Sequence, residues 1–296
     1  MAGALVPFDD RDGSIWFDGK LIPWREAKVH VLTHALHYAS AVFEGQRVYD
    51  GEVFLLEAHT DRLFASGKLL GFDIPFTRDE INRACKDVIV ANKMQNGYMR
   101  PIAWRGPEQM GVAAQHTKIH VAIAAWTWPS YFTPEAKLKG LRLNISDWKR
   151  PAPDCAPTRA KAAGLYMICT LSKDKAEAAG YQDSLMLDYR GQIAEATGAN
   201  IFFVKDGVLH TPKPDCFLDG LTRREVMKLA RARGIEIVER AIQPGEMEGF
   251  EQCFITGTAV EIFPVSEIGS YRFEVGSLVQ TLMKDFDTLV GQRSAA

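Results

Sequence analysis

The sequence predicts a two-domain protein that mixes helices and strands. A length of 296 residues is ample for two modest domains, each with its own hydrophobic core. Apolar segments with strand-like and helix-like spacing occur on both sides of residues 129–136 (PSYFTPEA), where prolines, aromatic residues and small polar residues mix as in a linker. We therefore place one domain at residues 1–128, an interdomain loop at 129–136 and a second domain at 137–296.

Composition and charge exclude several classes of protein. Apolar residues make up 47% and charged residues 24%, which is ordinary for a soluble globular protein. The formal net charge of −2 offers no broad basic surface for nucleic acid or an anionic membrane. The N-terminus lacks the layout of a signal peptide, and no apolar stretch has the length of a membrane helix. We expect a cytoplasmic protein whose five widely spaced cysteines are reduced thiols.

In the first half, turn and capping signals place the elements. Residues 14–17 and 20–24 flank Asp18-Gly19, a pair that predicts a β-hairpin. Thr77 and Glu80 have the spacing of a capping box and predict the start of a helix. The other elements predicted in this half are a hairpin around residues 49–52, a helix at 59–70 closed by Gly71, and strands at 98–105 and 118–128.

In the second half, predicted strands are interrupted by two helices. The first helix is predicted at 164–179, closed by Gly180. The second runs from Leu221 to Arg233, and we expect Thr222 and Glu225 to form its capping box. The predicted strands lie at 141–146, 184–188, 201–204, 208–210, 235–239 and 251–256.

Three closely spaced histidines raise the question of a metal site. His30, His34 and His37 would share one face of a helix, as metal ligands often do. Residues 29–32, however, alternate as in a strand, and no nearby carboxylate completes a ligand set. Because spacing alone is a weak signal, we expect no metal here and keep a metal hydrolase as an alternative.

Four other segments combine a functional group with small neighbours. Lys161 lies in Ala-Lys-Ala-Ala-Gly, and Glu195 follows a predicted strand within Ile-Ala-Glu-Ala. Gly220-Leu221-Thr222 opens a predicted helix, where backbone N–H groups and the helix dipole favour an anion. Residues 256–259 (TGTA) offer further amides and a hydroxyl. Each pattern taken singly is common, so these residues permit a cofactor site without requiring one.

In their joint order, these segments resemble the branched-chain amino acid aminotransferases of the fold-type IV (class IV) family, which use pyridoxal 5′-phosphate (PLP). The resemblance runs from about Ile15 to Val265. It implies the two-domain D-amino acid aminotransferase-like fold, with a small α+β domain followed by a larger α/β domain. Eight blocks carry the resemblance: residues 28–38 (KVHVLTHALHY), 42–45 (VFEG), 98–101 (YMRP), 109–112 (QMGV), 160–164 (AKAAG), 195–200 (EATGAN), 218–223 (LDGLTR) and 257–261 (GTAVE).

The resemblance implies a catalytic lysine and a set of cofactor-binding residues. Lys161 matches the lysine that forms a Schiff base with PLP and then serves as general base. Glu195 matches the partner of the pyridine nitrogen, and Tyr166 matches the tyrosine at the ring hydroxyl. The remaining cofactor-binding positions that the resemblance implies are Arg62, Gly198, Asn200, Leu221, Thr222 and Thr258.

The resemblance also implies a substrate pocket. Arg100, with Tyr38 and Tyr131, matches the site that receives the distal carboxylate of glutamate. The amides of Thr258 and Ala259 match the clamp on the α-carboxylate. The other implied pocket positions are Phe43, Gly45, Tyr98 and Met110.

The activity implied is ping-pong transamination between branched-chain L-amino acids (Leu, Ile, Val) and 2-oxoglutarate, by a homodimer or larger homo-oligomer. Related class IV proteins leave alternatives open: aminodeoxychorismate lyases, D-amino acid aminotransferases and R-selective amine transaminases. A non-catalytic PLP-binding protein is a further alternative. The blocks at residues 98–100 and 109–112 favour the branched-chain L-amino acid type.

Overall fold

The computed structural model describes residues 6–128 and 134–291, which divide into two compact units. Unit 1 comprises residues 6–128 with Ala160–Gly164, and unit 2 comprises residues 134–159 and 165–291. The segment that carries Lys161 therefore packs with unit 1, although residues of unit 2 flank it on both sides in the sequence. The division into separate domains at 1–128 and 137–296, made from the sequence, stays a prediction. Of the predicted interdomain loop, residues 129–133 lie outside the described residues, and helix α4 (Pro134–Lys139) occupies the rest.

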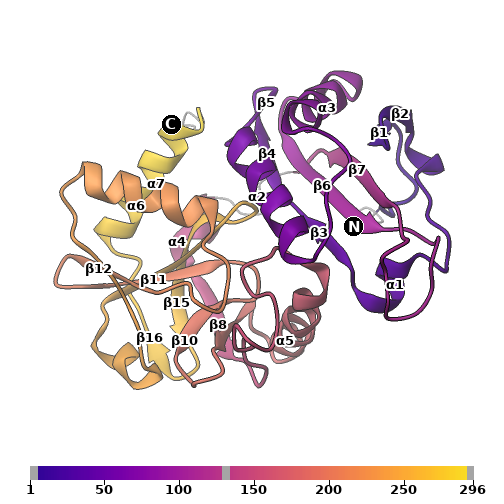
Figure 1. Ribbon diagram of the computed structural model, residues 1–296. Coiled ribbons are helices and arrows are strands. Elements are labelled where there is room, and N and C mark those ends of the chain that lie inside the picture. The colour runs from indigo at the N-terminus through magenta and orange to yellow at the C-terminus, as the bar shows by residue number, and fades with distance from the viewer. Residues whose placement is uncertain (1–5, 129–133, 292–296) are drawn as a thin grey trace. The chain divides into compact units, whose positions relative to one another are not determined.

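Unit 1 is built on an antiparallel sheet of seven strands (Figure 1). Their order is β2-β1-β7-β6-β4-β5, and β3 pairs with β6. Both predicted hairpins are confirmed, and Asp18 and Gly19 have the positive φ values, 45° and 97°, that a tight hairpin turn requires. The strands are β1 (Ser14–Phe17), β2 (Lys20–Pro23), β3 (Ala41–Phe43), β4 (Gln46–Tyr49), β5 (Glu52–Val53), β6 (Gly97–Arg105) and β7 (Ile119–Trp126).

Two helices of similar length, α2 (Leu56–Leu69) and α3 (Arg78–Ala91), pack against this sheet and against each other (Figure 1). The predicted capping box at the start of α3 is confirmed: the Glu80 N–H donates to the Thr77 hydroxyl at 3.2 Å, and the Thr77 N–H donates to the Glu80 carboxylate at 2.7 Å. Helix α2 begins three residues before its predicted start.

The strand predicted at residues 29–32 is wrong. These residues form a loop and a turn that lead into the short helix α1 (His34–Tyr38). The apolar side chains that suggested a buried strand face, Val29 and Val31, are both exposed. The alternation therefore marks a protruding apolar loop rather than a strand in a sheet.

Unit 2 contains a nine-stranded sheet whose first part closes on itself (Figure 1). The order is β10-β9-β8-β15-β14-β11-β12-β13, and β10 also pairs with β11, so six strands form a ring. Side chains inside it, such as Leu185, Ile201 and Ile255, are fully buried. The strands are β8 (Leu141–Ile145), β9 (Asp183–Leu187), β10 (Ile193–Ala196), β11 (Asn200–Lys205), β12 (Val208–Pro212), β13 (Ile237–Arg240), β14 (Gln252–Gly257), β15 (Glu261–Ile268) and β16 (Tyr271–Arg272).

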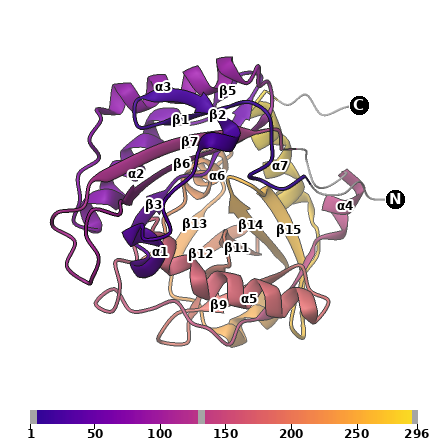
Figure 2. The same ribbon diagram turned by 90° about the vertical axis from the view of Figure 1, so that its right-hand side faces the viewer.

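The helices of unit 2 pack on the outside of this sheet. Helix α5 (Met167–Ala178) packs against β9, and α6 (Leu221–Ala232) packs against α7 (Ser277–Leu289) (Figure 2). The single helix predicted at 164–179 is a 3-10 turn (Ala163–Tyr166) followed by α5. Short 3-10 turns also occur at Trp24–Glu26 and Pro244–Gly249. No helix of the described residues is long and apolar enough to cross a membrane.

The capping box predicted at Thr222 is wrong. Helix α6 begins at Leu221, as predicted, but its N-cap is Gly220, two residues before Thr222. Thr222 therefore lies inside the first turn, where its side chain is buried. As a glycine cap has no side chain to accept from the first amides of the helix, these N–H groups are left to a different acceptor.

Candidate active site

Backbone contacts hold Lys161 in place within unit 1. The Phe43 N–H donates to the Lys161 carbonyl at 3.0 Å, and the Lys161 N–H donates to Ser66 Oγ of α2 at 3.0 Å. The lysine Nζ lies 4.8 Å from the centroid of the Phe43 ring. Burial, aided by the positive charge of Arg62, lowers the pKa of the Lys161 amine from 10.5 to about 8. This amine is therefore largely neutral in mildly alkaline solution, unlike that of an exposed lysine.

Arg62, the predicted phosphate ligand, is held by a carboxylate that sequence reasoning missed. Arg62 Nε and Nη2 donate to the two carboxylate oxygens of Glu44 at 2.7 and 2.8 Å. Glu44 lies in the VFEG block at the turn between β3 and β4, and its side chain is fully buried. Its place in a block that resembles the family was the only sequence signal for Glu44, because no local pattern marks a buried glutamate.

Arg100 and Tyr98, two predicted pocket residues, lie side by side on β6. Arg100 Nη2 donates to Tyr98 Oη at 3.4 Å, and the Arg100 guanidinium lies 4.7 Å from the centroid of the Phe43 ring. A Cβ atom on Gly45 would come within 1.9 Å of Tyr98 Oη, so a larger residue there would displace the Tyr98 ring. Arg100 Nε is buried and has no hydrogen-bond partner in the described residues.

Two further predicted pocket residues are not part of this group, and a third lies outside the described part of the chain. Tyr38 at the end of α1 and Met110 in the loop before β7 are exposed. The His34 ring and the Gly111 carbonyl lie 3.0 Å apart, which ties α1 to that loop. Tyr131 lies outside the described residues, so its role stays a prediction.

Glu195, the predicted partner of the pyridine nitrogen, is held by two side chains of unit 2. It lies on β10, 8% exposed, and its Oε1 is 3.3 Å from Nε of the buried Arg150. Asn200 Nδ2 donates to the other oxygen at 3.3 Å. Burial acts to lower the pKa of Arg150, but Glu195, with smaller contributions from Cys169 and Tyr166, raises it above the ordinary value. Sequence reasoning missed Arg150, a buried cation behind the predicted site.

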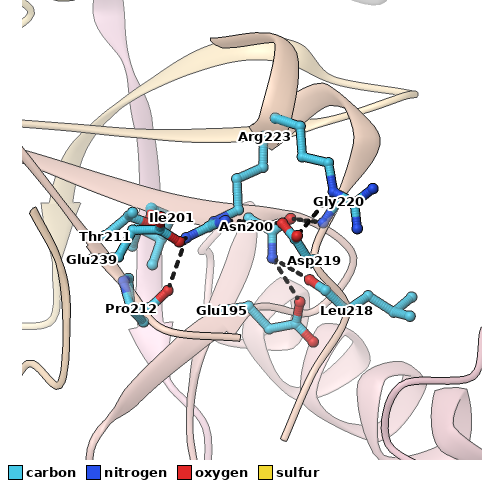
Figure 3. Close-up of polar contacts among 11 residues, drawn as sticks. Glu195, Asn200, Ile201, Thr211, Pro212, Leu218, Asp219, Gly220, Arg223 and Glu239 are labelled. Atoms are coloured by element: carbon cyan, nitrogen blue, oxygen red, sulfur yellow. Dashed lines mark hydrogen bonds and ion pairs between the residues drawn. The ribbon is translucent and has the colours of Figure 1, made fainter. Parts of the chain in front are cut away.

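Asn200 joins Glu195 to the beginning of α6 (Figure 3). Its amide nitrogen also donates to the Leu218 carbonyl at 2.9 Å, and its carbonyl oxygen accepts from the Gly220 N–H at 3.1 Å. The buried Arg223 donates to Asp219 at 2.9 Å and to Glu239 at 2.7 Å, which fixes the first turn of the helix. The N-terminus of α6, with Leu221 and Thr222, is therefore held close to the Glu195 strand.

Three other predicted residues of unit 2, Gly198, Thr258 and Ala259, lie in turns at the same end of its sheet. Asn200 is paired across the sheet with both Glu195 and Thr256. Gly198 lies in the turn between β10 and β11, and Thr258 and Ala259 lie in the turn after β14. A Cβ on Gly257 would lie 3.3 Å from the Gly198 carbonyl, so these two turns approach each other closely.

The three histidines bind separate partners. The His30 ring accepts from the Leu32 N–H, the His34 ring contacts Ser40 and the Gly111 carbonyl, and the His37 ring contacts the Val31 carbonyl. In the described part of the chain, ligand-type atoms converge instead at Asp188, Asp215 and Cys216. There the Arg190 guanidinium already binds both carboxylates, at 2.6 and 2.9 Å, and burial raises the pKa of the Cys216 thiol to about 12.

The family Amino-transferase class IV matches residues 41–268 of this sequence. The chain is 40% identical over 294 residues to a branched-chain-amino-acid aminotransferase of Pseudomonas aeruginosa, covering 97% of this chain and 96% of that one. It is 41% identical over 270 residues to the enzyme of the same name from Escherichia coli K12, covering 88% and 87%. The chain belongs to the class IV aminotransferases, so the predicted family and enzyme class are confirmed.

Solved structures agree with this assignment. A branched-chain amino acid aminotransferase from T.th., solved with pyridoxamine 5′-phosphate, superposes with a TM-score of 0.92 at 36% identity, covering 96% of each chain. That of Escherichia coli superposes with a TM-score of 0.91 at 37% identity, covering 96% of this chain and 97% of the other. The predicted class IV fold is therefore confirmed.

Proposed function

We propose that this chain is a PLP-dependent transaminase that moves an amino group between branched-chain L-amino acids and 2-oxoglutarate. One observation carries the proposal: the Phe43 ring is bordered by a reactive amine, Lys161 at 4.8 Å, and by a guanidinium, Arg100 at 4.7 Å. Such a ring suits an alkyl side chain, and the guanidinium suits the distal carboxylate of 2-oxoglutarate. The two named relatives carry the corresponding enzyme name.

The residues present fit PLP. Lys161 supplies an amine with a lowered pKa, and Glu195 supplies a buried carboxylate for the pyridine nitrogen. Arg62 and the amides at the start of α6, with Leu221 and Thr222, suit the phosphate dianion. In this proposal Tyr166 serves the ring oxygen, and Gly198, Asn200 and Thr258 complete the cofactor set.

The chemistry then assigns a task to each residue. PLP, when bound, supplies a ring that accepts electrons from the substrate's α-carbon. Lys161 Nζ would take the proton from that carbon and deliver it to the carbon that was the cofactor's aldehyde, because its lowered pKa keeps a neutral amine available. The fixed carboxylate of Glu195 keeps the pyridine nitrogen protonated. The amides of Thr258 and Ala259 hold the substrate's α-carboxylate.

The proposal includes a cytoplasmic homodimer. Five apolar side chains on α1 and the loops beside it are exposed: Val31, Leu32, Leu36, Met110 and Val112, here called the α1 patch. Patches of this kind on a soluble protein mark interaction surfaces. Two predicted substrate residues, Tyr38 and Met110, lie in or next to this patch, so we propose that a second copy of the chain covers it and shares these residues.

A panel of amino donors tests the activity. With 2-oxoglutarate as acceptor, we expect L-leucine, L-isoleucine and L-valine to react, with parallel double-reciprocal plots as in ping-pong kinetics. Borohydride should fix the cofactor to Lys161, identified by peptide mass. Activity confined to D-amino acids or to R-amines would indicate another class IV transaminase. Release of pyruvate from aminodeoxychorismate without an amino acceptor would indicate a lyase. If no amino donor bleaches the absorbance of bound PLP, the protein binds the cofactor without catalysing transamination.

A further inference from the structure

The turn between β3 and β4 buries a carboxylate to which the proposed chemistry assigns no task. Glu44 is 0% exposed, and its backbone N–H donates to the Pro101 carbonyl of β6 at 2.8 Å. The neighbouring Phe43 N–H donates to the Lys161 carbonyl. Glu44 is thus fixed to the sheet one residue away from the segment that carries the reactive lysine.

Three hydrogen bonds occupy this carboxylate, all from one face of α2. Arg62 donates twice, from Nε and Nη2 at 2.7 and 2.8 Å, in a bidentate pair. His59, one helical turn earlier, donates from Nδ1 at 2.6 Å. His59 is buried and Arg62 is nearly so, with its side chain 16% exposed. This arrangement restricts the rotation of the arginine.

The charges of the three groups are settled by their contacts. Burial acts to raise the pKa of the Glu44 carboxyl, but Arg62, together with His59, holds it well below its usual range. Burial lowers the pKa of the His59 imidazole, so the ring is neutral and Nδ1 carries its proton toward the carboxylate. Arg62 and Glu44 therefore form a neutral pair, with one guanidinium held in a fixed orientation.

We propose that Glu44 is a positioning residue for the cofactor's phosphate, which acts by fixing the guanidinium of Arg62, while His59 keeps the carboxylate in place. The inference rests on the proposed function, in which Arg62 binds the phosphate of PLP. A free arginine side chain loses rotamer entropy when it orders around an anion. Glu44 removes that loss in advance, because two of the arginine's N–H groups are already bound.

Paired ligands separate this role from a general structural one. Glu44→Gln keeps the shape and removes the charge, and binding of PLP and of phosphate-free pyridoxal to the apoprotein is measured by absorbance at pH 9. We expect the Kd for PLP to rise about tenfold, the effect of losing one charged contact, and the Kd for pyridoxal to change less than about twofold. Asp61→Asn is the matched control on α2: it removes an exposed acid that pairs with Arg78, and should change neither Kd.

A double-mutant cycle adds a second test, which measures the coupling between Glu44 and Arg62 directly. Arg62→Met with Glu44→Gln leaves no unpaired charge, and the glutamine oxygen still accepts from His59. If Glu44 acts through Arg62, introducing Glu44→Gln into the Arg62→Met protein should raise its Kd for PLP by less than about twofold. The inference is overturned if Glu44→Gln raises the Kd for PLP and the Kd for pyridoxal by the same factor. It is also overturned if Glu44→Gln raises the Kd for PLP equally with and without Arg62. Failure of the unaltered protein to bind PLP on Lys161 instead rejects the proposed function, and the inference falls with it.

Discussion

At the scale of single residues, the surroundings of Lys161 decide its reactivity. Burial and the charge of Arg62 lower the pKa of the amine from 10.5 to about 8, while Glu44 acts in the opposite direction. At pH 7 this change raises the neutral fraction of the amine about 300-fold over that of an unperturbed lysine. Only the neutral amine is a nucleophile or a base, so the site gains reactivity near physiological pH.

This shift predicts the pH dependence of cofactor capture. The rate at which apoprotein condenses with pyridoxal should rise with pH and level off above about pH 8, because the amine has then lost its proton. The measurement is stopped-flow absorbance between pH 6.5 and 10. Nα-acetyl-lysine is the control, and its rate should keep rising up to about pH 10. A protein rate that rises in parallel with this control would show that burial does not perturb Lys161.

The site residues that the sequence could indicate are those within short motifs. Lys161 and Glu195 each lie in a block of small residues, and the family resemblance of these blocks in their joint order predicts their roles. Glu44 and Arg150 could not be assigned a role in this way. Arg150 is 45 residues from its partner Glu195, and Glu44 is 18 residues from Arg62. Only folding brings these charges together, so their roles depend on contacts that a linear pattern does not contain.

At the scale of elements, the beginning of α6 depends on a glycine for steric reasons. Gly220 has an ordinary negative φ of −61°, so its backbone conformation suits any residue. A Cβ there would lie 2.2 Å from Asn200 Oδ1, the atom that accepts from the Gly220 N–H. Asn200 would have to move, and with it the amide that contacts Glu195.

Gly220→Ala should therefore weaken both the fold and the site. We expect the free energy of unfolding to fall by about 1–3 kcal/mol, the range for forcing an extra methyl group into a packed region. The Kd for PLP should rise as well, because Glu195 loses its contact with Asn200. Gly245→Ala is the control, since no atom lies within 4 Å of its added Cβ. Denaturant unfolding and PLP titration of both variants provide the measurement, and equal stability of the two would contradict the steric argument.

Elements with local chemical signals were predictable, and those specified by distant contacts were not. Asp18-Gly19 favours a turn through its positive φ values, the Thr77–Glu80 pair starts a helix through its own hydrogen bonds, and both predictions are confirmed. Thr222 has the same local pattern, but the N-cap is Gly220, two residues earlier, and the Gly220 N–H donates to the distant Asn200. Strand β15 contains Pro264, which disfavours a strand in sequence, yet it pairs with both β14 and β8 in the ring.

At the scale of the whole molecule, the α1 patch is an exposed apolar surface that the packing of unit 1 does not explain. Val112 is 87% exposed and Leu36 is 63% exposed, and the contact between His34 and Gly111 holds their two segments together. Burying such side chains against a partner contributes roughly 25 cal/mol per Å² of apolar surface. The predicted substrate residues Tyr38 and Met110 lie in or beside the patch, so assembly and substrate binding would depend on the same surface.

The dimer proposal predicts that a charge in this patch separates the subunits. Val112→Glu should convert the dimer to a monomer at micromolar concentration, because a carboxylate buried in an apolar interface costs several kcal/mol. Val90→Glu is the matched control, because Val90 is 77% exposed on α3, outside the patch. The Val90→Glu protein should stay dimeric. Sedimentation velocity measures the mass, and transamination of L-leucine measures the linked loss of activity. A dimeric, fully active Val112→Glu protein would show that the patch is not the interface and that Met110 is not shared between subunits.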